Sequence, residues 1–119
     1  MRERVRWIDH RGRRVLLHDY TKLNHHNYAE TIKQRVQEIQ AEGFKDLLLL
    51  LDVTDSYVDK DALAVFKQAG REVRPHVHKL AVVGVSGVQK FFLQLINQFS
   101  NVGARPFDTE GEALEWLIR

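Results

Sequence analysis

The segment from residue 79 to residue 90 contains the residues that come nearest to a catalytic motif. Its Gly84-x-Ser86-Gly87 begins like the Gly-x-Ser-x-Gly nucleophile elbow of hydrolases, but Val88 stands where the last glycine belongs. In that class of hydrolase the catalytic histidine follows the serine. All histidines of this chain precede Ser86: His10, His18, His25, His26, His76 and His78. The sequence therefore disfavours a serine hydrolase, and we predict that the chain has no catalytic residues.

Ser86 and Gln89 instead predict the start of a helix. Their spacing is that of a capping box, in which the serine side chain accepts the amide proton of the glutamine. The free amides of a helix start favour an anion or a polar ligand, so Ser86 and Gly87 are candidate ligand-binding residues. Lys90 follows Gly87 by three residues with no hydroxyl after it. The Walker spacing is therefore incomplete, and nucleotide hydrolysis is not supported.

A second polar corner, residues 52–56, follows the aliphatic run of residues 47–51. A receiver domain would place its phosphoacceptor at a position such as Asp52, with an acidic pair after an earlier strand and a lysine after a later one. Asp19 stands alone, however, and Lys79 precedes its strand. We interpret Asp55, Ser56 and Asp59 as cap and first-turn residues of a helix. We also predict Thr54 and Ser56 as candidate ligand-binding residues.

Metal binding has little support in the sequence. The chain has no cysteine, which excludes disulfides, thiolate catalysis and cysteine-ligated metals. Only His25-His26 and His76-x-His78 have ligand-like spacing, and no third ligand accompanies either pair. We therefore predict no metal and no cofactor.

Length and composition are those of an ordinary globular protein. The chain has 119 residues, of which 44% are hydrophobic and 29% charged, and we expect one domain over residues 1–119. Residues 1–6 lack the apolar core of a signal peptide, and the longest aliphatic run is too short to cross a bilayer. We expect a cytoplasmic protein.

Basic residues are concentrated at the N-terminus. The first 14 residues hold six arginines against two acids, whereas the net charge of the whole chain is only +2. These arginines are predicted to contact a membrane or an acidic partner: Arg2, Arg4, Arg6, Arg11, Arg13 and Arg14. The alternative is a solvated sheet edge whose charges prevent edge-to-edge pairing. Nucleic-acid binding is not expected, because exposed aromatics do not alternate with the basic residues.

Hydrophobic periodicity predicts an α/β protein with the order β-β-α-β-α-β-α-β-α. A hairpin turns at residues 9–13, and a helix over residues 24–42 carries Asn27 and Glu30 as its capping box. The next elements are strand 46–53, a helix that begins at Ser56, strand 79–85, the helix that begins at Ser86, an edge strand over 104–107, and a final helix capped by Thr109. Strands that alternate with helices predict a mostly parallel sheet, with the first strand antiparallel to the second.

The aliphatic run of residues 47–51 shows no alternation, so both faces of its strand must be buried. Right-handed crossovers between neighbouring strands would place the connecting helices on one face only. The hairpin, a helix that folds over, a second subunit or an apolar ligand must cover the other. We predict that such a ligand would lie between the helix lined by Phe66 and the helix lined by Phe91, Phe92 and Phe99, with Phe66 and Phe92 as contacts.

With its elements in this order, the chain resembles the SpoIIAA-like family of the STAS superfamily, which is related to CRAL-TRIO lipid-binding domains. The resemblance spans essentially the whole chain. It is carried by residues 48–54 (LLLLDVT), residues 79–84 (KLAVVG) with Lys90, residues 107–110 (FDTE) and residues 113–117 (ALEWL). It implies a four-turn β-α superhelix of bacterial origin with no established catalysis.

The resemblance also implies a regulatory site. Anti-sigma-factor antagonists of this superfamily are phosphorylated on a serine within an Asp-Ser-Ser-Gly-Leu-like segment at the start of the second helix. This chain reads Asp55-Ser56-Tyr57-Val58 there, without the second serine and the glycine. Ser56 and Thr54 are the candidate phosphorylation sites.

Three functions follow, in order of preference. The first is a non-enzymatic regulatory or ligand-binding module for a small apolar or amphipathic ligand, a membrane surface or a protein partner, with homodimer formation left open. The second is a phosphorylation-switched antagonist of an anti-sigma factor. The third is a small hydrolase that would use Ser86, His78 and Asp52.

Overall fold

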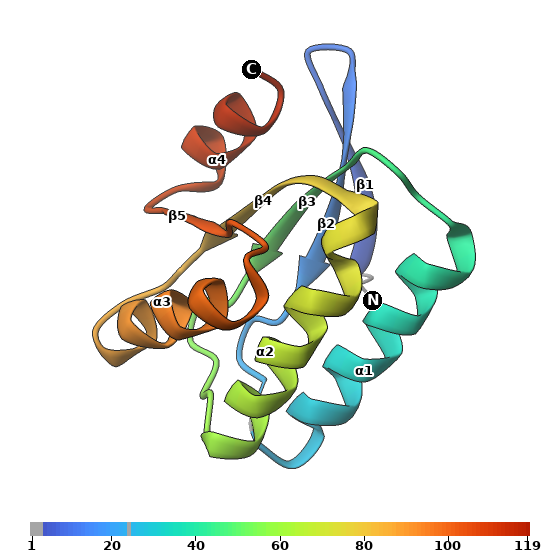
Figure 1. Cartoon of the computed structure of the whole chain (residues 1–119). Helices are drawn as coiled ribbons and strands as arrows, with labels where there is room; N and C mark the ends of the chain where they lie inside the picture. Colours follow the sequence, from blue (N-terminus) through green and yellow to red (C-terminus); the bar gives the residue numbers. More distant parts are fainter. Residues whose placement is uncertain (1–3, 24) are drawn as a thin grey trace.

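Five strands form one sheet in the order β1-β2-β3-β4-β5 (Figure 1). The computed structural model describes residues 4–23 and 25–119, without the side chains of His25 and His26. Its strands are β1 (Val5–His10), β2 (Arg13–Asp19), β3 (Leu47–Asp52), β4 (Val77–Val83) and β5 (Arg105–Phe107). β1 pairs antiparallel with β2, and all other pairs are parallel. The predicted α/β class and the antiparallel first strand are confirmed.

Four α-helices cover the two faces of this sheet unequally. They are α1 (His25–Glu42), α2 (Lys60–Val73), α3 (Val88–Ser100) and α4 (Glu110–Leu117), with a short 3-10 helix at Arg74–His76. Helices α1, α2 and α3 each join neighbouring parallel strands in the same direction along the sheet, so they lie on one face. Helix α4 follows the edge strand and packs on the opposite face (Figure 1). Of the alternatives considered for the second face, a helix that folds over is the one observed.

Strand β3 shows how the leucine run serves two cores. Leu49 packs with the residues of α1, α2 and α3, whereas Leu48 and Leu50 pack with Ala113 and Leu117 of α4. Successive side chains of a strand point to opposite faces, so an uninterrupted aliphatic run supplies both cores. This arrangement explains why no polar residue interrupts the strand.

Three of the predicted helix caps are wrong and one is confirmed. Helix α1 begins at His25, within one residue of its predicted start, so Asn27 lies inside its first turn rather than at the cap. Helix α2 begins at Lys60, because Asp59 rather than Ser56 accepts the amide proton of its third residue, at 2.8 Å. Helix α3 follows Gly87, which occupies the cap position with a φ of 54° and has no side chain that could cap the helix. Thr109 caps α4 as predicted, accepting from the amide of Glu112 at 3.2 Å.

The corners at the carboxyl ends of β2 and β3 have the same local structure. Asp19 accepts from both the amide and the hydroxyl of Thr21, and Asp52 accepts likewise from Thr54. Gly84 follows β4 with a φ of 90°, and a Cβ there would lie 2.6 Å from the amide nitrogen of Thr54. Three strand ends therefore lie close together at this edge of the sheet. The polar residues of the two Asp-x-Thr turns stabilise the corners through their hydrogen bonds.

Candidate ligand-binding site

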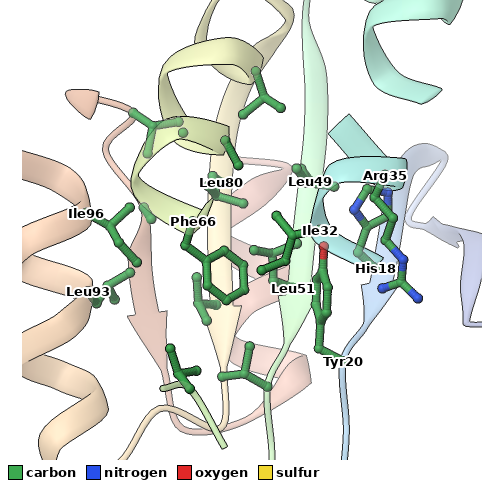
Figure 2. Close-up of a pocket in the computed structure, with 18 of the residues that line it drawn as sticks. His18, Tyr20, Ile32, Arg35, Leu49, Leu51, Phe66, Leu80, Leu93 and Ile96 are labelled. Atoms are coloured by element: carbon green, nitrogen blue, oxygen red, sulfur yellow. The ribbon is translucent and has the colours of Figure 1, made fainter. Parts of the chain in front are cut away.

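An apolar cavity of about 90 Å³ lies between the sheet and helices α1, α2 and α3. Its labelled lining residues come from six elements (Figure 2): His18, Tyr20, Ile32, Arg35, Leu49, Leu51, Phe66, Leu80, Leu93 and Ile96. Pockets that enclose drug-sized ligands measure about 300–1,000 Å³, whereas an engineered apolar cavity of about 150 Å³ admits benzene. The cavity therefore suits a short alkyl chain or one small apolar group.

The predicted aromatic walls are correct in part. Phe66 of α2 and Phe92 of α3 line the cavity. Phe91 and Phe99, which were placed in the same wall, lie on the outside of α3 with 56% and 38% of their surfaces exposed. That Phe66 and Phe92 contact a ligand stays a prediction.

The predicted polar contacts lie apart from the cavity. Ser56 is buried, and its hydroxyl donates a hydrogen bond to the carbonyl of Val53 at 2.8 Å. Because the Ser56 proton is used there, the Tyr28 hydroxyl, 2.9 Å away, donates to the Ser56 oxygen. Burial raises the pKa of Tyr28 to about 12. Thr54 is exposed, and its hydroxyl donates to Asp52 at 2.6 Å. None of these side chains faces the cavity.

Ser86 and Gly87 are exposed where α3 begins. The side chain that connects this point to the rest of the protein is that of Gln89, which lines the cavity and donates to the carbonyl of Ser56 at 2.9 Å. Of the two hydrogen bonds of the predicted capping box, only the one from the Ser86 amide to the side-chain Oε1 of Gln89 is present, at a long 3.5 Å. A ligand role for Ser86 and Gly87 therefore stays a prediction that is separate from the cavity.

One end of the cavity carries polar side chains that the sequence analysis did not identify. His18 is only 2% exposed, lines the cavity and lies beside Tyr20, with the two ring centroids 6.4 Å apart. Burial, reinforced by the nearby Arg35 guanidinium, lowers the pKa of His18 to about 3. The imidazole is therefore neutral at neutral pH, with one nitrogen able to donate and one able to accept.

Arg35 and Tyr20 complete this polar end. The Arg35 side chain is 6% exposed, donates to the Asp19 carbonyl at 3.0 Å and lies 4.4 Å from the centre of the Tyr20 ring. Among the residues that the structure describes, it forms no ion pair with a carboxylate. Burial raises the pKa of Tyr20. In the sequence, His18 and Arg35 carried only a weak signal, because neither belongs to a recognisable motif and each has a polar neighbour, Asp19 or Gln34.

The hairpin arginines make contacts within the protein. Arg11 pairs with Glu115 of α4 at 3.2 Å, and Arg13 donates to the carbonyl of Ile118 at 3.2 Å. His10 donates to the same Glu115 carboxylate at 2.6 Å, and this hydrogen bond lowers the pKa of Glu115. The hairpin tip is thereby attached to the helix that covers the second sheet face.

Two of the other predicted contact arginines, Arg4 and Arg14, also make contacts within the protein. Arg14 lies 4.2 Å from the centre of the Trp7 ring, and Arg4 donates to the carbonyl of Thr21 at 2.9 Å. Arg6 is half-buried, with its Nε unpartnered among the described residues. Arg2 lies outside the described residues. Contact of these side chains with a membrane or an acidic partner stays a prediction.

His76 and His78 are not brought into a metal-binding group within the part of the chain that the structure describes. His76 hydrogen-bonds the carbonyl of Phe44 at 2.7 Å, and the exposed His78 lies near the start of β4, at the opposite end of that strand from Ser86. The side chains of His25 and His26 lie outside the description. Elsewhere in the described chain, no three His, Asp or Glu side chains form a group that could hold a metal ion.

None of the helices in the described chain combines the length and the hydropathy that crossing a membrane requires.

Comparisons with known proteins identify a family and a fold. A model of the SpoIIAA-like family matches residues 19–118. Among solved structures, an uncharacterized protein from the DUF3478 family with a SpoIIAA-like fold, from Shewanella loihica PV-4, superposes with a TM-score of 0.69. The two sequences are 17% identical, and the match covers 95% of this chain and 91% of that one. A search of curated proteins finds no match.

Proposed function

The chain belongs to the SpoIIAA-like family, and from that premise we propose that it is a non-enzymatic binding protein. The fold of this family supports a regulatory or binding module. Its ligand is a small apolar or amphipathic molecule held between the sheet and helices α1–α3. The observation that carries this proposal is the apolar cavity beneath α2 and α3, which is lined by Phe66 and Phe92.

The shape and chemistry of the cavity define the ligand class. Apolar walls favour a ligand by removing its hydrocarbon surface from water, at about 25 cal/mol per Å². A volume of about 90 Å³ limits the buried part to a short alkyl chain. The neutral ring of His18 brings hydrogen-bonding nitrogens to the end of the cavity, so a single hydroxyl or carboxyl group on that chain is the matching polar group.

The positions of the hydroxyl and histidine side chains support binding rather than catalysis. The hydroxyls of Ser56 and Thr54 are hydrogen-bonded within their turns, away from the cavity. None of the four described histidine side chains is hydrogen-bonded to Ser86. A nucleophile is activated by a base within hydrogen-bonding reach, and this arrangement supplies none for a hydrolase at Ser86.

The phosphorylation hypothesis loses its support at Ser56, because a kinase needs an accessible hydroxyl and Ser56 is only 9% exposed. Thr54 is exposed, so it is the hydroxyl on which a phosphorylation switch would now depend. A protein partner, homodimer formation and a cytoplasmic location stay predictions.

Hexanol is a suitable first probe for the cavity. We expect saturable shifts of the methyl resonances of Leu49, Leu80 and Ile96 in NMR titrations, because these side chains line the cavity. Hexanediol is the matched control molecule, since its second hydroxyl would be buried without a partner at a free-energy cost of about 1–3 kcal/mol.

A cavity-filling variant distinguishes hexanol binding in the cavity from hexanol binding on the surface. Ala69 lines the cavity, whereas Ala64 is exposed on the same helix. Ala69→Leu should abolish hexanol binding, and Ala64→Leu should leave it unchanged, with the folding of both checked by thermal unfolding. Equal binding by both folded variants, or no hexanol binding by the wild type, would contradict the proposed cavity function.

A further inference from the structure

Large apolar side chains are exposed mainly on one part of the described molecule. Five of them are at least one-third exposed: Trp7, Tyr57, Val88, Phe91 and Phe99. Three belong to α3, and Tyr57 lies in the loop to which the Gln89 side chain of α3 is hydrogen-bonded. Trp7 is different, because Arg14 and Phe44 lie against its ring. Clustered exposure of this kind marks an interaction surface rather than ordinary scatter.

Helix α3 has two apolar faces. One contains Leu93 and Ser100, is buried and packs toward the sheet and α2. The other is an outward stripe at helical spacing, formed by Val88, Phe91, Leu95 and Phe99. At 100° per residue, the centre of this stripe lies about 145° from the direction of Leu93 and Ser100. The core therefore explains only one of the two faces, and we call the other the α3 stripe.

The charge around the α3 stripe is positive. Residues 73–107, which include the whole of α3, contain no aspartate and no glutamate. Lys90 is exposed on α3 itself, on the polar side of the helix and about 145° from the centre of the stripe. From α2, the Lys67 ammonium and the Arg71 guanidinium lie 4.9 Å and 3.9 Å from the centre of the Phe99 ring. Cations therefore border the apolar surface, with no acid on the same segment to neutralise them.

We propose that the α3 stripe docks on the surface of an anionic lipid bilayer. A convex helix face that carries phenylalanines and is bordered by lysine and arginine has the composition of an interfacial helix, whose apolar side chains insert while its cations meet lipid phosphates. A second copy fits less well, because two stripes packed face to face would bring like charges together. This membrane contact is separate from the one predicted for the hairpin arginines.

This docking surface does not depend on a ligand in the cavity. Phe92, Leu93 and Ile96 line the cavity from the inner side of α3, whereas Val88 and Phe91 point outward. A dissolved probe such as hexanol tests the inner side, and a vesicle tests the outer side. Either can fail while the other succeeds.

Vesicle flotation tests the proposal directly. The full chain is mixed with vesicles of phosphatidylcholine alone or of equal parts phosphatidylcholine and phosphatidylglycerol. We expect it to float with the anionic vesicles and not with the neutral ones, and to be released as salt is raised. Combined Val88→Ser and Phe91→Ser substitutions should weaken vesicle binding about tenfold or more. They should leave hexanol binding intact.

Two controls match these changes. Gln94→Ser with Gln98→Ser alters the polar side of the same helix and should have no effect on vesicle binding. Lys67→Gln with Arg71→Gln should weaken binding by about the same factor as the serine pair, because these are the cations that lie against Phe99. Lys33→Gln, on the exposed side of α1, should have a much smaller effect.

Several results would overturn the proposal. Absence of vesicle binding is one, and binding that survives the double serine variant is another. Equal binding to neutral and anionic vesicles would remove the role of the cations. A dimer in sedimentation velocity that depends on Val88 and Phe91, without vesicle binding, would assign the stripe to a second copy instead.

Discussion

The two faces of the sheet are packed to different degrees. On the α4 face, Val15, Leu50, Ala113 and Leu117 are each no more than 1% exposed. On the face covered by α1, α2 and α3, the core surrounds a cavity and includes the polar residue His18. Close packing maximises dispersion contacts, and an internal space forfeits some of them. The comparison indicates that one face mainly stabilises the fold, while the other gives up some stability and keeps an internal space, in which we propose that a ligand binds.

The largest expected effect compares neighbouring leucines of β3. Leu50 points to the α4 face and Leu49 borders the cavity. Leu50→Ala should lower the free energy of unfolding by about 3–4 kcal/mol, because it opens a new cavity in a filled core. Leu49→Ala should cost about 2 kcal/mol, since its side chain already lacks neighbours on one side. Urea denaturation measures both, and equal losses would argue that the two faces are equally well packed.

The next effect concerns His18 and pH. Its pKa is about 3 in the folded protein, against an ordinary 6.5. Between these pH values His18 binds a proton in the unfolded chain but not in the folded chain. The His18 contribution to the free energy of unfolding is therefore fully present above pH 6.5 and is lost as the pH drops toward 3. Between pH 7 and pH 4.5 the loss should be about 2–3 kcal/mol.

His18→Leu isolates this pH effect from that of the carboxylates. The variant should lack the His18 part of the acid sensitivity, measured as the difference between the wild-type and variant free energies of unfolding at the two pH values. An identical pH dependence in both proteins would show that the His18 ring is not held neutral beside Arg35.

Two helical glycines test the faces with a smaller effect. A Cβ on Gly70 of α2 would lie 2.7 Å from the Cβ of Ser100, which α3 holds in place, so Gly70→Ala should destabilise by about 1–2 kcal/mol. Gly111 of α4 has open space around its position, and Gly111→Ala should stabilise by about 0.5–1 kcal/mol. Thermal unfolding reports both; a stabilising Gly70→Ala would contradict the close approach of α2 and α3, and a destabilising Gly111→Ala would contradict the open space on α4.

The smallest expected change is on the outer side of α3. Phe91→Ser should alter the free energy of unfolding by about 0.5 kcal/mol or less, because this side chain is mostly exposed. Leu93→Ala, on the buried side of the same helix, should cost about 2 kcal/mol. If Phe91→Ser were as costly as Leu93→Ala, the stripe would be part of the core and not a docking surface.

Some candidate-site residues were predictable and others were not. Phe66 and Phe92 could be placed at the cavity because each follows the apolar spacing of its helix. Phe91 and Phe99 could not be separated from them, since α3 is apolar around more than half of its circumference. Periodicity identifies a core face only when the opposite face is polar. His18 and Arg35 were missed because their burial depends on α1 packing over β2, a contact between distant elements.

By itself, the sequence determined the order of the elements, the parallel sheet and the burial of β3 on both faces. These follow from local signals, namely aliphatic runs, helical spacing and the residues that end each element. Only the tertiary structure decided that α4 covers the second face, that Ser56 lies in a turn before α2, and that a cavity remains under α2 and α3. Such features depend on how separate elements pack together, and local residue spacing does not encode that packing.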